Sequence, residues 1–233
     1  DRGVRNFVVS ELPEDTSIYK NCNFLKVAKP LKSLQKLAAS HRSMFDVPVV
    51  GITGSNGKTV VKEWLYHIIS PYKIVTRSPR SYNSQIGVPL SVWLMNENTE
   101  IGIFEAGISE MGEMSELRNV IRPTIGIITN IGGAHQENFT SMQDKCMEKL
   151  QLFKDCDVVI YNGDNELISK CVSKSLFSAR EIAWSTKDVE RPLYIESIKK
   201  NDDHTDIKYR YLGFFKEYRI PFIDDASIEN SIN

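Results

Sequence analysis

Residues 54–59, Gly-Ser-Asn-Gly-Lys-Thr, combine small residues with a lysine and a threonine in an order that suits phosphate binding. They follow the apolar run 48–53 and precede apolar residues at helical spacing over 58–69. Between a strand and a helix, small residues let backbone N–H groups converge on a phosphate at the positive end of the helix. Lys58 would place positive charge against the terminal phosphates, and the Thr59 hydroxyl would bind Mg²⁺. The segment therefore predicts a nucleotide phosphate loop.

One position departs from the usual phosphate-loop pattern, which has a glycine five residues before Gly57. This chain has Ile52 there, so the loop is a shorter G-x-x-G-K-T variant. The alternative interpretation is a glycine-rich turn with an incidental Lys-Thr pair. The strand before the loop and the helix after it favour phosphate binding.

Polar residues also end two other strand-like runs. Glu105 ends the apolar run 101–106, where a charge is costly unless it is paired or metal-bound. Asn130 ends the run 124–130. His135, a common type of metal ligand, comes shortly after the two glycines that follow this run. The plainer interpretations are a carboxylate that caps a loop and an ordinary loop or core histidine. Because parallel sheets bind ligands beyond the carboxyl ends of their strands, we expect both residues near the phosphate loop.

A helix predicted over 141–153 carries Lys145 and Lys149. Its amphipathic spacing places both on the polar face, so composition alone predicts two solvated lysines. The spacing by itself gives Lys149 no role.

Strand-like and helix-like segments alternate from residue 47 onward, and nearly all the strands are apolar throughout. This pattern predicts a mostly parallel α/β sheet, covered by helices on both faces. Three later segments without helices between them predict an antiparallel β extension at one end of the sheet. The expected strands are 48–53, 72–77, 101–106, 124–130 and 157–161, the expected helices are 58–69, 87–96, 113–121 and 141–153, and the extension covers 192–200, 206–213 and 215–222.

Residues 1–46 do not follow this alternation. Strand-like runs at 6–11 and 23–27 and a helix over 30–45 predict the tail of a preceding domain and a linker, with the central ATP-binding domain at 47–233. The chain also lacks an initiator Met, so we expect a fragment or a processed form.

Composition narrows the class of protein. With 41% hydrophobic and 25% charged residues, the chain can bury a core. A net charge of −1 gives no general attraction to nucleic acid or to an acidic membrane, and no apolar run approaches the ~18 residues of a spanning helix. The four cysteines form no Cys-x-x-Cys pair, which predicts reduced thiols in a cytoplasmic protein.

An ordered set of motifs resembles the Mur ligase family, whose members join an amino acid or peptide to a carboxylate using ATP. The resemblance covers about residues 47–233, and the family's own tight phosphate loop accounts for Ile52. Two motifs, NSQIGVPLS and EAGISEMGE, are most similar to the MurF branch, which adds D-alanyl-D-alanine to UDP-N-acetylmuramoyl-tripeptide. The motifs are GITGSNGKT, SYNSQIGVPLSV, FEAGISEMGEM, TNIGGAHQENF, EKLQLF and YNGDN.

The resemblance implies a role for each matching residue. ATP would be bound by Gly54, Ser55, Asn56, Gly57, Lys58, Thr59 and Asn130, and its adenosine by Asn162, Asp164 and Asn165. Two Mg²⁺ ions would be held by Thr59, Glu105, His135 and a carbamylated Lys149. Catalysis would rest on Lys58, Asn83, Glu105, His135 and Lys149, with Asn83 near the reacting carboxylate and the γ-phosphate.

The resemblance also implies a reaction and its partners. The tripeptide carboxylate would attack the γ-phosphate to give an acyl phosphate and ADP, and the amine of D-alanyl-D-alanine would then displace the phosphate. A separate C-terminal domain brings the amine in this family, and we expect these 233 residues not to include it. We therefore expect this chain, as a monomer, to bind nucleotide without ligating. Nucleic acid and membrane are not expected partners.

Two departures from the family pattern stand out. Ser84 replaces a second asparagine after Asn83, and Ala226-Ser227 replaces a His-Asn pair. The altered motifs are most similar to a branch fused to an alanine racemase, whose PLP would lie outside this chain.

Three other interpretations stay open. The chain can belong to another Mur-type ligase, such as the one that adds the third residue of the peptide or a folylpolyglutamate synthase. It can also be a phosphate-loop kinase or GTPase, in which Lys149 would be an ordinary lysine. A nucleotide-binding module without ligase activity is the third alternative.

Overall fold

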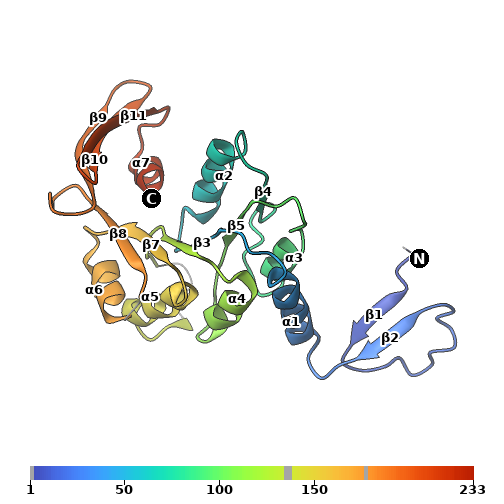
Figure 1. Cartoon of the computed structure of the whole chain (residues 1–233). Helices are drawn as coiled ribbons and strands as arrows, with labels where there is room; N and C mark the ends of the chain where they lie inside the picture. Colours follow the sequence, from blue (N-terminus) through green and yellow to red (C-terminus); the bar gives the residue numbers. More distant parts are fainter. Residues whose placement is uncertain (1–2, 134–137, 176–177) are drawn as a thin grey trace.

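A nine-stranded sheet forms the centre of the computed structural model, which describes residues 3–133, 138–175 and 178–233. The strand order is β11-β10-β9-β8-β7-β6-β3-β5-β4 (Figure 1). The strands from β4 to β9 pair in parallel, whereas β9, β10 and β11 form an antiparallel meander at one end, so the predicted fold class is confirmed. The strands are β3 (Val49–Thr53), β4 (Val75–Arg77), β5 (Ile101–Glu105), β6 (Ile125–Ile128), β7 (Val158–Asn162), β8 (Arg180–Ser185), β9 (Leu193–Lys200), β10 (Thr205–Tyr211) and β11 (Phe214–Ile220).

Helices cover both faces of this sheet (Figure 1). Helices α2 and α7 lie on one face, and α4, α5 and α6 lie on the other. The helices are α1 (Pro30–Arg42), α2 (Lys58–Ile69), α3 (Gly87–Val92), α4 (Glu113–Ile121), α5 (Met142–Leu150), α6 (Glu166–Lys174) and α7 (Asp225–Ile232), and a 3₁₀ turn, Gln151–Phe153, extends α5.

The two-residue period of a strand explains why the inner strands are apolar throughout. In β3, Val50 and Ile52 pack against α2 residues such as Val61, whereas Val49 belongs to the core on the opposite face. All five residues of β3 are buried. Both faces of the strand therefore face protein, as expected for a parallel sheet between two helical layers.

The structure differs from the expected elements in several places. The strand expected over 72–77 is limited to β4, and the helix expected over 87–96 ends at Val92, because the chain tightens into i→i+3 hydrogen bonds such as Met95 N–H to Val92 O. Helix α6 and strand β8 were not predicted. The evidence for α6 was present in the sequence, because Asn165 caps the helix and Ile168 and Val172 are buried four residues apart.

The N-terminal residues form a separate element joined to the sheet domain through α1. Strands β1 (Asn6–Val9) and β2 (Asn23–Lys26) pair in parallel with each other and project from the body (Figure 1). Helix α1 packs on α3 and α4, and its buried Arg42 donates hydrogen bonds to the carbonyls of Ile121 and Arg122 at the end of α4. Helix α1 is therefore fixed to the helices that cover the sheet.

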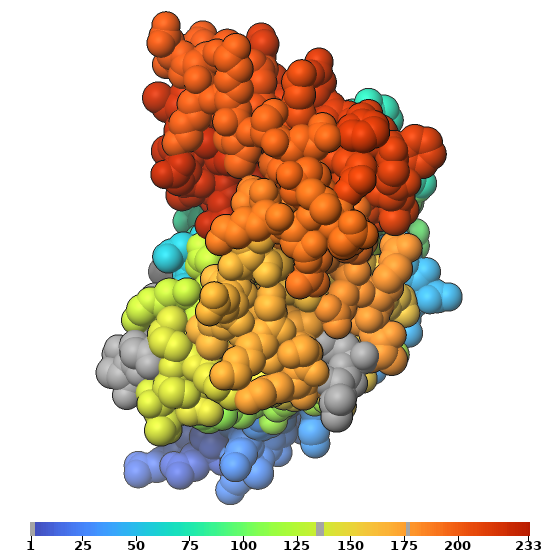
Figure 2. Space-filling view, turned by 90° about the vertical axis from the view of Figure 1, so that its left-hand side faces the viewer, coloured from blue at the N-terminus to red at the C-terminus, as the bar shows by residue number. Residues whose placement is uncertain are grey.

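The meander projects beyond the parallel part of the sheet and carries α7 back toward it (Figures 1 and 2). Trp184 of β8 joins residues of the meander and of α7 in a separate apolar cluster. In the part of the chain that the structure describes, no helix is long and apolar enough to cross a membrane.

Gly126 of β6 gives a direct test of this packing. A Cβ at this position would lie 2.4 Å from Cδ1 of Phe153, so we expect Gly126→Ala to lower the free energy of unfolding by about 1–3 kcal/mol, measured by urea denaturation. Adding Phe153→Leu should recover part of the loss, because it removes the ring that the new methyl group meets. Equal stability of Gly126→Ala and the unaltered chain would contradict the packing described here.

Candidate functional site

The phosphate loop joins β3 to α2 and needs glycine at two positions. Gly54 has a φ of +146°, and a Cβ there would lie 2.0 Å from Oγ1 of Thr129. Gly57, the residue before α2, has a φ of +81°, and a Cβ there would lie 2.2 Å from Oδ1 of Asn230 on α7. The positive φ angle makes any larger residue strained at each position, and the close neighbour leaves little room for a side chain.

The loop after β6 holds the phosphate loop in place. Asn130 accepts hydrogen bonds from the Ser55 amide through its carbonyl, at 2.9 Å, and from the Asn56 amide through its side chain, at 3.0 Å. The Ser55 hydroxyl donates to the carbonyl of Gly132 and accepts from its amide. Because Val61 donates the first described helical hydrogen bond, to Gly57 O, the amides at 58–60 lack intrahelical acceptors and can receive an anion.

A completely buried carboxylate lies beside the start of α2. Oε2 of Glu105, at the end of β5, accepts from the Thr59 hydroxyl at 2.9 Å. Its Oε1 lies 3.2 Å from Nζ of Lys62, which is also completely buried. The two residues predicted to share a metal ion are therefore in direct contact, and the cation that neutralises the carboxylate is one that sequence reasoning missed.

Three lysines surround the carbonyl side of the loop. Nζ of Lys58 donates to Gly54 O at 2.8 Å, and Nζ of Lys149 donates to the same carbonyl at 3.3 Å. Lys145 is buried beside them and donates to Gly132 O. Helix α5 therefore turns Lys145 and Lys149 inward, so the prediction that both are solvated lysines is wrong.

Burial and mutual repulsion change the acidity of these lysines. Burial, followed by the nearby Lys58 and Lys145 cations, lowers the pKa of Lys149 to about 7. Burial also lowers the pKa of Lys58, although Glu105 partly opposes this shift. At neutral pH a substantial fraction of Lys149 side chains is therefore an uncharged amine, which is a nucleophile.

A cavity of about 140 Å³ collects most of the predicted catalytic residues. Asn83 reaches it from the segment before α3, which is fixed by a hydrogen bond from the Gly107 amide to Asn83 O. A cavity well below the ~300 Å³ of a drug-sized pocket suits a phosphoryl group and a carboxylate, with the rest of a nucleotide outside. Its lining residues are Gly54, Ser55, Lys58, Asn83, Ser84, Gly107, Ile108, Ser109 and Lys149.

The donors present suit Mg²⁺ bound together with a nucleotide. Within residues 3–133, 138–175 and 178–233, no three His, Cys, Asp or Glu side chains form a metal-binding group. Mg²⁺ is usually held by one or two carboxylates, with substrate phosphates and water completing its shell. Glu105 and Thr59 supply the protein part of such a shell, next to amides and lysines that can receive the phosphates.

The residues predicted to contact adenosine lie two strands away, at the end of β7. Asn162 donates to Glu229 of α7 at 3.1 Å. Asp164 accepts hydrogen bonds from Ser185 and Thr186, which hold its pKa below the ordinary value although burial acts in the opposite direction. Asn165 caps α6. Helix α7 links this segment to the phosphate loop, and contact with adenosine stays a prediction for all three residues.

His135, predicted as a metal ligand, lies outside the described residues. Lys62 was missed because a lysine within a helix is ordinarily solvated. One signal for it existed: Lys62 lies three residues after Thr59 and three before the apolar Leu65, and therefore on the inner face of α2.

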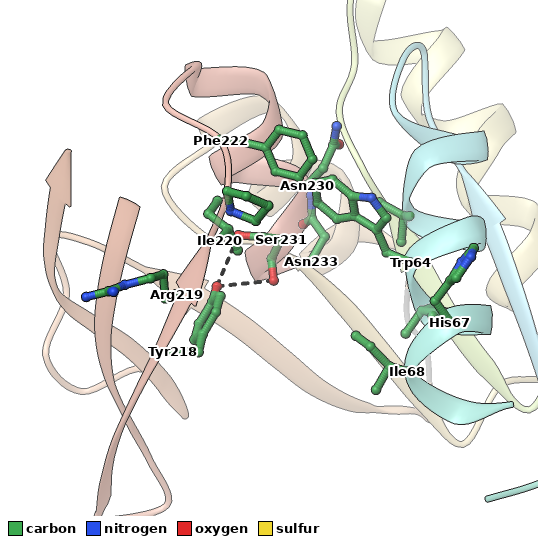
Figure 3. A pocket seen from close by; sticks show the side chains of 13 residues that line it. Trp64, His67, Ile68, Tyr218, Arg219, Ile220, Phe222, Asn230, Ser231 and Asn233 are labelled. Atoms are coloured by element: carbon green, nitrogen blue, oxygen red, sulfur yellow. Dashed lines mark hydrogen bonds between the residues drawn. The ribbon is translucent and has the colours of Figure 1, made fainter. Parts of the chain in front are cut away.

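A separate apolar cavity of about 350 Å³ lies between α2 and the meander (Figure 3). Trp64 of α2 stacks on Phe222 at one side, and Tyr218 bonds to Ser231 of α7 at the other. None of the residues predicted to bind phosphate or metal lines it, so it is distinct from the candidate reaction site.

Comparison with known proteins gives consistent results. A family model described as the Mur ligase middle domain matches residues 52–232. The UDP-N-acetylmuramoyl-tripeptide–D-alanyl-D-alanine ligase of Borreliella burgdorferi is 33% identical over 100% of this chain and 51% of its own length, and that of Bacillus subtilis is 29% identical over 91% and 46%. The chain thus spans about half the length of these curated relatives.

Solved structures share the fold. MurF from Acinetobacter baumannii superposes with a TM-score of 0.85 at 20% identity, covering 97% of this chain and 49% of its own. MurF ligase from Thermotoga maritima, solved in complex with ADP, gives a TM-score of 0.84 at 20% identity, covering 99% and 59%. At this level of identity the likeness concerns the fold alone.

The low pKa of Lys149 predicts a pH-dependent contribution to stability. In the unfolded chain this lysine keeps its proton up to a pH of about 10.5. In the folded protein the lysine loses the proton near pH 7. Between these values the unfolded state binds more protons, so stability rises with pH by up to about 1.4 kcal/mol per unit. In buffer free of CO₂, urea denaturation of the unaltered chain should show this rise relative to Lys149→Met. Parallel profiles for the two proteins would rule out the low pKa.

Proposed function

The chain belongs to the Mur ligase family, and on that premise we propose that the full-length protein is an ATP-dependent ligase that adds D-alanyl-D-alanine to UDP-N-acetylmuramoyl-tripeptide. The observation that carries the proposal is the contact of Glu105 with Thr59, directly beside a cavity shared by Lys58, Asn83 and Lys149. These residues come from separate segments of the chain, which this fold brings together. The substrate assignment is supported by the names of the curated relatives.

In the first step the tripeptide carboxylate attacks the γ-phosphorus of ATP, which forms an acyl phosphate and releases ADP. Both reactants are anions, so the step needs positive charge that is already in place. Lys58 and the amides at the start of α2 supply it, and Asn83 reaches the same cavity to orient the carboxylate. Mg²⁺ held by Glu105 and Thr59 would add charge neutralisation at the phosphates. The amine of D-alanyl-D-alanine then attacks the acyl carbon, the amide forms, and phosphate leaves.

We propose that Lys149 reacts with CO₂. Its neutral amine would attack the carbon of CO₂ and lose one proton, giving a carbamate with one negative charge. The charges of Lys58, Lys145 and Lys149 repel one another, and the carbamate would replace one of those charges with an anion. That anion could hold a second Mg²⁺, which an ammonium group cannot do.

The domain organisation belongs to the same proposal. Residues 1–46 would be the end of a domain that binds the UDP-sugar, followed by a linker that includes α1. Residues 47–233 would form the central ATP-binding domain, and the reaction would take place in the cytoplasm.

The proposed activity is tested on the full-length protein by phosphate release from ATP with UDP-N-acetylmuramoyl-tripeptide, with and without D-alanyl-D-alanine. We expect amide product only with both substrates, and a loss of kcat of about 10²-fold or more in Lys58→Met and in Glu105→Gln. Lys73→Met, which alters an exposed lysine paired with Glu100, is the matched control and should keep full activity. If another amino acid or dipeptide is the better acceptor, the assignment to this branch of the family is wrong.

The carbamate is tested with ¹³C-bicarbonate. A carbamate carbonyl signal should appear in the NMR spectrum of the unaltered protein, and should strengthen as the pH rises through about 7 because the neutral amine reacts. Lys149→Met should lose the signal, whereas Lys73→Met should keep it. No signal from a folded, unaltered protein would refute the modification.

A further inference from the structure

The acceptors around Lys62 occupy its ammonium group completely, so it has no donor left for a phosphate. Its ammonium group donates to Ser78 O at 2.8 Å and to Arg80 O, and it lies 3.2 Å from carboxylate oxygens of both Glu105 and Glu63. An ammonium group has three donors, so this one is fully used. The side chain is completely buried and therefore cannot turn toward solvent.

The charge of Lys62 matters because it lies next to the carboxylate proposed for the metal. Glu105 accepts from Lys62 through one oxygen and from Thr59 through the other. Lys62 and Glu105 together carry no net charge, and the neighbouring Lys58 makes the surroundings positive. The second carboxylate near Lys62, that of Glu63, is itself paired with Arg77 at 3.1 Å. A bare divalent cation would therefore meet no net negative charge here.

The same side chain also fixes the segment that leads to Asn83. The carbonyls of Ser78 and Arg80 bind Lys62, and the Ser78 hydroxyl accepts from the Glu105 amide at 3.4 Å. Arg80 itself has a positive φ of 47°, which a non-glycine residue keeps only when its surroundings hold it. One buried cation thus connects α2, the end of β5 and the connection between β4 and α3.

We propose that Lys62 is a positioning residue that makes the metal site depend on nucleotide. It neutralises Glu105, so that a divalent cation alone binds weakly, and it fixes the carboxylate where a cation carried by phosphates can reach it. The inference rests on the proposed ATP and Mg²⁺ chemistry of this site. The proposed role of Lys62 explains why one carboxylate and one hydroxyl are enough protein ligands for the metal ion. The phosphates bring the remaining negative charge together with the metal.

The test uses Mn²⁺ alone, without nucleotide or peptide, on the full-length protein. Free Mn²⁺ is followed by its EPR signal during titration. We expect weak binding by the unaltered protein and about tenfold tighter binding by Lys62→Met, because the carboxylate loses its neutralising partner. Lys62→Arg keeps the positive charge and should stay weak. Lys73→Met is the control for loss of a lysine elsewhere, and Lys62→Met/Glu105→Gln should bind weakly again.

Lys62→Met leaves a buried carboxylate without its cation, so Lys62→Gln is the second neutral variant, with an amide that still donates to Glu105. A folded neutral variant that binds Mn²⁺ no more tightly than the unaltered protein would overturn the proposal. Tight binding of Mn²⁺ alone by the unaltered protein would also overturn it. Because the titration involves no turnover, its result is separate from the ligase assay.

Discussion

A carboxylate buried at the end of an inner strand is the constraint on which the rest of this site depends. An unpaired charge at that depth would strongly destabilise the fold, so both oxygens of Glu105 need partners. Thr59 and Lys62 of α2 supply them, one turn of helix apart. This requirement fixes the rotation of α2 about its axis, and with it the direction of Lys58 and of the loop amides. The pairing of the Glu105 carboxylate at the end of β5 therefore also orients the phosphate loop that follows β3.

The parallel sheet brings the other parts of the site to the same edge. Strands β5, β3 and β6 are neighbours, so the residues after their carboxyl ends meet although they lie far apart in the sequence. Helix α5 adds Lys149 from the opposite face. Helix α7 comes from the far end of the sheet, and its Asn230 reaches Gly57. The meander thus reaches the phosphate loop through α7, the helix that follows it.

The sequence analysis succeeded where one local signal was strong and failed where the outcome depended on tertiary packing. The periodic apolar residues of α2 and α4 predicted both helices, and a lone acid after an apolar strand correctly marked Glu105 as unusual. Composition assigned Lys145 and Lys149 to solvent, and no prediction was made for Lys62, because a helical pattern does not show that carbonyls of another segment will receive a lysine. Helix α6 was missed although its cap and spacing were readable. The role of Lys149 came from family resemblance alone.

The Gly54 carbonyl, which accepts from both Lys58 and Lys149, affects how the phosphate loop releases and binds a nucleotide. Nζ of Lys58 and Nζ of Lys149 both donate to this one oxygen, so the half-buried ammonium group of Lys58 has an acceptor within the protein itself. A phosphate is a stronger, charged acceptor, and Lys58 can exchange the carbonyl for it. The carbonyl thus gives the Lys58 ammonium group a partner between turnovers, so the departure of a spent nucleotide does not leave this charge without an acceptor.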